Sequence, residues 1–432
     1  MRCCGFLLML CLLSEALPVL GVGGEVGNPE ELNPESAMYT DGAAGLGPGT
    51  DPAAEPGEVG IDPAVSVSGS EGTDPEPPAV SAAGAVLLSG ETGRVIFGKN
   101  PHEKRSMAST TKILTALVAL EEVERLGDPI VEITEEMTAV EGSSMGLRPK
   151  DRLSLTDVVG GMMMSSGNDA ANTIALYLGE TEEGFQEMMN RRAREIGMTD
   201  SYFVTASGLD APAHVSTPYD MGLLGVEALR NQQFREICGA SAYEVTFLKQ
   251  DSVSAQDPER TVRYENHNKL LKLYEDCIGI KTGFTKKSGR CLVSAAERDG
   301  TLLVAVTLNA PDDWQDHMDL FAYGFSRLSS RIFDERAFTA GIPVVGSDRE
   351  TILVGGIYGG KADLPKGTDL TRVVKLPKFL YGDVEKGERV GYIEYRQEGQ
   401  TVYRLPILAQ QEVRSIRTNW FQRMIKKIFH RE

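Results

Sequence analysis

The sequence predicts an α+β domain over residues 80–335, followed by a small all-β module over residues 336–413. In the first segment, short apolar runs typical of strands lie at both ends, and segments with helical spacing lie between them. From Thr339 to Val413, Val, Ile, Leu and Tyr alternate with turn residues every eight to twelve positions. A chain of 432 residues, 41% of them hydrophobic, can form two or three domains with real cores.

The expected elements follow from local pattern. Two strand-like runs flank the turn signal Gly90-Glu91-Thr92-Gly93 and predict a hairpin. Apolar residues at helical spacing predict helices further along, and a continuous apolar run predicts a buried strand. In chain order, the first domain should contain strands at 85–88 and 95–98, helices at 107–122 and 154–178, a strand at 302–308 and a helix at 318–328. In the all-β module, strands are expected near 351–354, 373–376 and 389–393.

The N-terminus predicts export. Residues 1–24 carry Arg2, a short leucine-rich apolar run and then small residues, the pattern of a signal peptide. Residues 25–79 are rich in Gly, Pro, Ala, Asp and Glu, and we expect a disordered acidic spacer because so few large apolar side chains cannot offset chain entropy.

The C-terminus predicts a membrane-associating helix over 414–432. Phe421, Met424, Ile425, Ile428 and Phe429 recur at helical spacing, while Arg423, Lys426 and Lys427 fall on the other side. A basic amphipathic helix of this kind binds the surface of an anionic membrane. The alternative is a helix packed on the β module. We therefore expect an exported protein that lies on a membrane surface.

The net charge of −18 makes nucleic acid an improbable partner. Beyond the leader only Cys238, Cys277 and Cys291 remain, which is neither a disulfide framework nor a zinc motif. No metal and no cofactor are expected.

Three short motifs carry the chemistry. Ser109-Thr110-Thr111-Lys112 begins a predicted helix, Ser166-Gly167-Asn168 follows a methionine run, and Lys281-Thr282-Gly283 follows an apolar run that predicts a strand. On a helix, Ser109 and Lys112 lie about one turn apart on the same face. A serine hydroxyl needs an adjacent base, and a lysine can serve when burial and neighbouring positive charge lower its pKa. Each motif alone is weak, but their order and context are specific.

With these motifs the chain resembles the serine-type D-Ala-D-Ala carboxypeptidases, which are low-molecular-mass penicillin-binding proteins of the peptidase S11 family. The resemblance extends through 108–117, 165–171 and 279–285, and to Ser143-Ser144-Met145 and Gly208-Leu209-Asp210. It implies a penicillin-binding/β-lactamase-like transpeptidase fold for the first domain. The chain departs from the family pattern at Ala206-Ser207-Gly208, where an Asn-x-x-Gly-Leu type of loop is expected.

The resemblance also implies roles. Ser109 attacks the bond between two D-alanines at the end of a peptidoglycan pentapeptide, Lys112 takes its proton, and Ser166 relays a proton to the leaving amine. The other residues bind substrate: Asn168 through its amide, Lys281, Thr282 and Gly283 at the terminal carboxylate, and the backbone N–H groups of Ser109 and Phe284 at the oxyanion. β-Lactam antibiotics should trap the acyl-enzyme.

Two alternatives remain open at this point. A class A β-lactamase needs a deacylating glutamate, and no Glu-x-x-Leu-Asn lies between the second and third motifs. A catalytically silent wall-binding protein would not need two paired lysines. His214 and His267 have no G-x-S-x-G serine as a partner, so a structural role is the favoured interpretation for both.

Overall fold

The computed structural model describes residues 75–250 and 258–416. In the first domain a five-stranded antiparallel sheet has the order β2-β1-β9-β8-β7. Its strands are β1 (Gly84–Ser89), β2 (Val95–Lys99), β7 (Cys277–Thr285), β8 (Gly289–Arg298) and β9 (Thr301–Leu308). The predicted hairpin at 85–98 and the predicted strands at 302–308 and at Lys281 are therefore confirmed.

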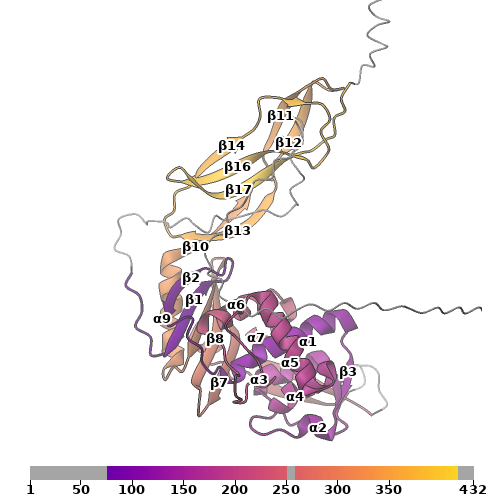
Figure 1. Cartoon of the computed structure of the whole chain (residues 1–432), viewed down its shortest axis with the longest axis vertical. Helices are drawn as coiled ribbons and strands as arrows, with labels where there is room; N and C mark the ends of the chain where they lie inside the picture. Colours follow the sequence, from indigo (N-terminus) through magenta and orange to yellow (C-terminus); the bar gives the residue numbers. More distant parts are fainter. Residues whose placement is uncertain (1–74, 251–257, 417–432) are drawn as a thin grey trace, which may run out of the picture. The chain divides into compact units, whose positions relative to one another are not determined.

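Helices cover both faces of this sheet (Figure 1). Val86 and Leu88 of β1 face one core, whereas Ala85 and Leu87 face the other, because successive side chains of a strand point to opposite sides. The second core is closed by α9 (Asp313–Arg327), which extends the predicted helix at 318–328 toward its N-terminus. The first core holds the other long helices of the domain.

The remaining helices build the larger core. They are η1 (Ala108–Thr111), α1 (Lys112–Leu126), α2 (Glu135–Thr138), α3 (Leu155–Ser165), α4 (Asn168–Gly179), α5 (Glu182–Ile196), α6 (Pro218–Ala228), α7 (Gln232–Gly239) and α8 (Leu270–Leu273). Two small antiparallel pairs join them: β3 (Ile130–Glu132) with β4 (Arg152–Ser154), and β5 (Ala242–Leu248) with β6 (Pro258–Glu265).

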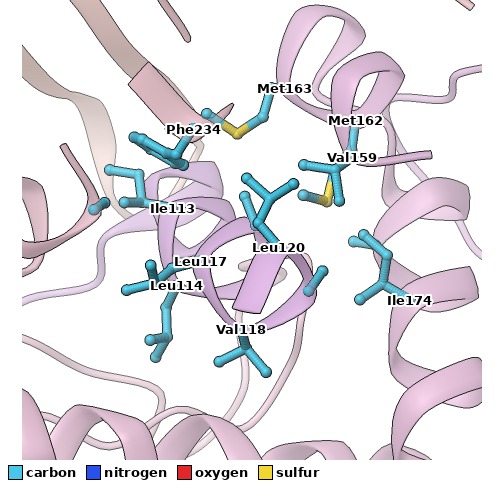
Figure 2. Packing of buried hydrophobic residues seen from close by; sticks show 14 of the residues in the cluster. Ile113, Leu114, Leu117, Val118, Leu120, Val159, Met162, Met163, Ile174 and Phe234 are labelled. Carbon is cyan, nitrogen blue, oxygen red and sulfur yellow. The ribbon is translucent and has the colours of Figure 1, made fainter. Parts of the chain in front are cut away.

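Helix α1 is at the centre of this core. Its first nine residues, Lys112 to Leu120, are all buried, so this part of the helix is enclosed on every side, whereas its last turn is exposed. Figure 2 shows Leu117 and Leu120 of α1 among Met162 of α3, Ile174 of α4 and Phe234 of α7. The buried methionines of α3 fill this core, as the sequence predicted.

The predicted helix at 154–178 is two helices instead of one. Helix α3 ends at Ser165, and α4 begins at Asn168. Ser166 between them has a φ of 58°, in the left-handed region, which stops a right-handed helix. Hydrophobic spacing continues across the break, so the periodicity did not reveal it. The break places the second motif at a corner of the chain, where Ser166 and Asn168 are nevertheless buried.

The all-β module consists of two sheets. A six-stranded sheet has the order β14-β16-β17-β12-β11-β15, and β10 pairs with β13 in a two-stranded sheet. The bounds are β10 (Leu328–Asp334), β11 (Thr339–Val345), β12 (Thr351–Gly355), β13 (Tyr358–Pro365), β14 (Thr371–Lys375), β15 (Leu380–Tyr381), β16 (Arg389–Gln397) and β17 (Gln400–Ala409). Phe333 of β10 stacks on Tyr403 with ring centroids 3.9 Å apart. Phe333 belongs to the hydrophobic core of the β module, and β10 follows α9 without a linker. The chain therefore enters the core of the β module before residue 335.

The predicted signal peptide and nearly all of the predicted spacer and terminal helix lie outside the described residues. Within the described ranges, no helix combines the length and the apolar character needed to cross a membrane.

Candidate active site

Ser109 lies in a tight turn at the start of the central helix. It belongs to η1, which runs directly into α1 at Lys112. Ala108, just before it, has a φ of 49°, an uncommon conformation for a residue with a side chain. Gly208, from a distant loop, packs on this turn so closely that a Cβ there would lie 1.9 Å from the carbonyl oxygen of Ala108. Such strain is typical of positions whose geometry the surrounding structure fixes.

The Lys112 amine makes three hydrogen bonds. Its Nζ lies 3.1 Å from Ser109 Oγ, 2.8 Å from Asn168 Oδ1 and 2.6 Å from the carbonyl oxygen of Ser207. A neutral amine keeps two hydrogens and a lone pair. An amide oxygen and a carbonyl oxygen can only accept, so those two hydrogens belong to Asn168 and Ser207. The lone pair therefore faces Ser109 Oγ, the geometry that a general base requires.

Electrostatics favours this neutral amine. Burial lowers the pKa of Lys112 well below its usual value of 10.5, and the charge of Lys281 lowers it further, while Asp169 opposes both effects. Removing an ammonium from water disfavours its charged form, and a nearby like charge does the same. The structure thus contains both conditions that the sequence analysis required for a lysine base.

The second motif supplies one of the two acceptors that orient this amine. Asn168 is the first residue of α4, and its Nδ2 donates to the carbonyl oxygen of Glu141 over 2.7 Å. The amide side chain is therefore fixed at both ends, with its oxygen toward Lys112. Gly167 allows the close approach, since a Cβ there would lie 2.8 Å from the backbone nitrogen of Met145.

The wall of the site is held by a buried carboxylate. Asp169 accepts hydrogen bonds from the Ser144 hydroxyl and from the backbone N–H groups of Met145, Gly146 and Leu147, at 2.7–3.1 Å. Such bonds to a charged acceptor are about twice as strong as neutral ones. Asp169 therefore fixes the loop at 144–147 beside Asn168, and the Ser143-Ser144-Met145 stretch noted in the sequence acquires a structural role.

The third motif lies on β7 against the nucleophile turn. A Cβ on Gly283 would lie 3.0 Å from the backbone nitrogens of Ser109 and Thr110, so glycine lets the strand approach this turn. Lys281 is buried, its Nζ donates to the carbonyl oxygen of Thr282 over 2.9 Å, and burial lowers its pKa to about 7. Phe284 projects its ring outward and is 66% exposed.

Comparisons with known proteins agree with this geometry. The family model described as D-alanyl-D-alanine carboxypeptidase (Peptidase_S11) matches residues 71–312. The chain belongs to this family. It is 30% identical to the D-alanyl-D-alanine carboxypeptidase DacC of Escherichia coli, over 78% of this chain and 86% of that protein. It is 25% identical to DacF of Bacillus subtilis, over 77% and 86%. Penicillin-binding protein 5 of Haemophilus influenzae shares the fold, with a TM-score of 0.64 at 23% identity over 79% of this chain and 99% of that one.

The chain is therefore a serine-type D-alanyl-D-alanine carboxypeptidase. The β-lactamase and the silent wall-binding protein are not favoured. Among the described residues of this carboxypeptidase, no cluster of three His, Cys, Asp or Glu side chains is arranged to hold a metal ion.

The structure gathers most of the predicted site residues of the carboxypeptidase. Ser109, Lys112 and Asn168 are linked by hydrogen bonds, and β7 brings Gly283 to the same turn. The three hydrogen bonds of Lys112 go to acceptors other than Ser166, so the relay role of Ser166 stays a prediction. Likewise, these contacts do not test the predicted substrate binding by Asn168, Lys281, Thr282, Gly283 and Phe284. They show only that Asn168 Oδ1 accepts a hydrogen bond from the Lys112 amine.

The sequence did not reveal two contacts of the carboxypeptidase site, although it favoured the structural role that His214 proves to have. The Ser207 carbonyl oxygen belongs to the segment that departs from the family pattern, and it is the nearest of the three hydrogen-bond partners of the Lys112 amine. His214 fixes that segment: its Nδ1 accepts from the Val204 backbone N–H over 2.8 Å, so its Nε2–H must donate to Thr111 Oγ1 at 2.9 Å. This histidine thus ties the loop to the residue beside Lys112, a structural role with a direct consequence for the base.

Proposed function

We propose that this carboxypeptidase removes the terminal D-alanine from peptidoglycan stem peptides, with Ser109 as nucleophile and Lys112 as general base. The observation that carries this assignment is the Lys112 amine 3.1 Å from Ser109 Oγ, whose other two hydrogen bonds go to the acceptor oxygens of Asn168 and Ser207. A hydroxyl and a base at this separation are the requirement for nucleophilic catalysis by serine.

In the acylation step, the Ser109 hydroxyl gives its proton to Lys112 Nζ while Oγ attacks the carbonyl carbon between the two D-alanines. The oxyanion forms at the N-terminus of η1 and α1, against β7, where backbone N–H groups of Ser109 and Phe284 are the proposed donors. The C–N bond then breaks, and the proton reaches the leaving amine through Ser166. Water hydrolyses the acyl-enzyme and releases the shortened peptide.

Recognition of the substrate depends on its C-terminal carboxylate. Lys281 is the buried lysine of the third motif, and Thr282 follows it on β7, which is an edge strand of the five-stranded sheet. A carboxylate bound there would stabilise the charged form of Lys281, whose pKa burial alone lowers to about 7. A β-lactam carries both a carboxylate and a reactive amide, so we expect it to acylate Ser109 and form an acyl-enzyme that water hydrolyses slowly.

The test is release of free D-alanine from a peptide ending in Lys-D-Ala-D-Ala. We expect turnover by the parent and none by Ser109→Ala, together with loss of labelling by a fluorescent penicillin. Ser166→Ala should slow both reactions, whereas Ser165→Ala is the matched control, because that hydroxyl bonds only within α3 to the Gly161 carbonyl. A folded Ser109→Ala protein that still releases D-alanine would overturn the assignment.

We also propose that the enzyme works outside the cytoplasm at the membrane surface. This rests on the signal-peptide pattern of 1–24 and on the basic amphipathic pattern of 414–432. The experiment is cell fractionation of the full chain and of a Phe421→Ser/Ile425→Ser variant. We expect the parent in the membrane fraction and the variant released. Recovery of the parent from the cytosol would contradict the proposal.

A further inference from the structure

One edge of the β module exposes large apolar side chains. Val345, Phe379, Tyr381 and Ile416, here called the apolar edge, are 50%, 44%, 70% and 60% exposed. Val345 of β11 pairs with Tyr381 of β15, and the rings of Phe379 and Tyr381 contact edge-on with centroids 4.9 Å apart. The Ile416 N–H donates to the carbonyl oxygen of Gly346 over 2.9 Å, which places it next to the end of β11.

This arrangement is not explained by packing within the described chain. Strand β15 is the outermost strand of its sheet and is only two residues long. Its shortness and the preceding Pro377 and Lys378 protect this edge from pairing with another strand. They do not cover the exposed aromatic pair beside it, and contiguous exposed apolar side chains mark a surface that contacts another partner.

The position of the chain's last described residues indicates which partner. Ser415 forms a bridge with Ser347, and Val413 forms one with Val384. The backbone N–H groups of Arg414 and Ser415 donate to the carboxylates of Asp348 and Asp383. These contacts anchor the segment that leads to Ile416, so the chain enters residues 417–432 directly beside the apolar edge.

The sequence that follows is the basic amphipathic segment, with Trp420 and Phe421 only a few residues beyond Ile416. Each extended residue spans about 3.5 Å, so a lipid surface bound by this segment lies within reach of the apolar edge. Tyr, Trp and Phe are the side chains best suited to the boundary between headgroups and acyl chains.

We propose that the apolar edge of the β module is a second lipid contact, which inserts into the interface of an anionic bilayer together with residues 417–432. The inference rests on the proposed membrane association and adds to it a folded surface with a fixed position beside the tail. The enzyme would then hold the membrane through two joined contacts, which restricts the orientation of the β module on the bilayer.

The experiment measures partition of the full chain onto phosphatidylglycerol/phosphatidylcholine vesicles by co-sedimentation. We expect Phe379→Ser/Tyr381→Ser to weaken partition by about tenfold, the effect of withdrawing roughly one to two buried apolar side chains. Tyr358→Ser is the matched control, because this tyrosine is 49% exposed but lies on β13 in the other sheet, and it should leave partition unchanged. All variants should release D-alanine from a soluble peptide at the parent rate.

The outcomes separate the two claims. If the parent does not bind vesicles, the proposed membrane association fails and the edge has no lipid partner. If the parent binds, Phe421→Ser/Ile425→Ser abolishes binding and Phe379→Ser/Tyr381→Ser leaves it unchanged, then the tail acts alone and the edge proposal is overturned.

A spectroscopic test distinguishes lipid from other occupants. In a Trp314→Phe/Trp420→Phe background, which removes both tryptophans of the chain, Tyr381→Trp places a single fluorophore on the edge. We expect its emission to shift to the blue only when vesicles are added. A blue shift without vesicles would show that the edge is already covered by the chain's own tail. A shift that depends on protein concentration would show that a second copy covers it, and either result would overturn the proposal.

Discussion

The orientation of the Lys112 amine can be tested by placing a charge on its acceptor. Asn168→Asp replaces an amide by a carboxylate of nearly the same shape, 2.8 Å from Lys112 Nζ. Two unit charges at that distance attract by about 6 kcal/mol at an effective dielectric constant of about 20. This corresponds to about four pH units, whereas shifts from a neighbouring opposite charge are usually 1–3 units, so we expect the pKa of Lys112 to rise by about two.

The consequence is a displaced pH profile. Only the neutral amine can accept the Ser109 proton, so each unit of increase in the pKa of Lys112 lowers the reactive fraction about tenfold below that pKa. Acylation by a fluorescent penicillin should be about 100-fold slower than in the parent at pH values below the pKa of Lys112 in the parent, and it should recover about tenfold per pH unit as pH rises. The assay is the second-order rate constant of acylation measured from pH 5.5 to 10.

The matched control is Asn172→Asp. Asn172 lies one turn further along α4, and its amide nitrogen donates to the carbonyl oxygens of Glu136 and Met137, away from Lys112. This variant reports the effect of a buried Asn→Asp change on the fold. The ascending limb of its acylation rate against pH should stay at the same pH as in the parent. If Asn168→Asp slows acylation equally at every pH, the amine of Lys112 is not the base and the reasoning is refuted.

Three further predictions follow from the same contacts. Lys281→Gln removes the positive charge that lowers the pKa of Lys112, so the ascending limb of the acylation rate against pH should move to higher pH by about one unit. The KM for a peptide with a free C-terminal carboxylate should also rise, whereas the KM for the matching C-terminal amide should stay unchanged. His214→Ala leaves Thr111 and two backbone N–H groups of the loop without their partner. It should lower the free energy of unfolding by about 1–3 kcal/mol and slow acylation. His214→Gln should restore part of the acylation rate if the hydrogen bond to Thr111 matters. Burial lowers the pKa of His317 to about 3 from 6.5, so between those pH values the unfolded chain binds a proton that the folded chain does not. The contribution of neutral His317 to the free energy of unfolding is therefore complete above pH 6.5 and is lost on acidification by about 1.4 kcal/mol per pH unit. Urea titrations should show this loss, and it should be smaller in His317→Asn.

The reliance of Lys112 on distant partners shows why some residues could be assigned early and others could not. Local pattern placed Lys112 on a helix and Lys281 on a strand, as the structure has them. It extended the helix to residue 107, whereas Ser109 lies in the 3₁₀ turn η1 that leads into α1. By contrast, Asn168 is 56 residues and Ser207 is 95 residues from Lys112 in the chain. A backbone carbonyl such as that of Ser207 has no signature in the sequence, because every residue has one.

The conformation of Ser166 is a feature of the secondary structure that local sequence pattern could not predict either. Its left-handed conformation divides α3 from α4, although the hydrophobic spacing of 154–178 continues through it. The break is fixed by contacts of Asn168 and Asp169 with the loop at 141–147, which periodicity cannot report. Similarly, β10 joins the β-module core through Phe333 and Tyr403, so the boundary between the two cores precedes the change in sequence texture.

The sequence by itself determined the α+β class, the β module, the three motifs and, through their resemblance, the family. These depend on residues close together in the chain, where spacing sets the geometry. Only the tertiary structure decided that Asn168 and Ser207 direct the Lys112 lone pair at Ser109, that Asp169 fixes the wall of the site, and that His214 secures the loop. A lysine becomes a base when burial removes its solvent and its remaining hydrogens are assigned to acceptors, and both conditions depend on segments that folding brings together.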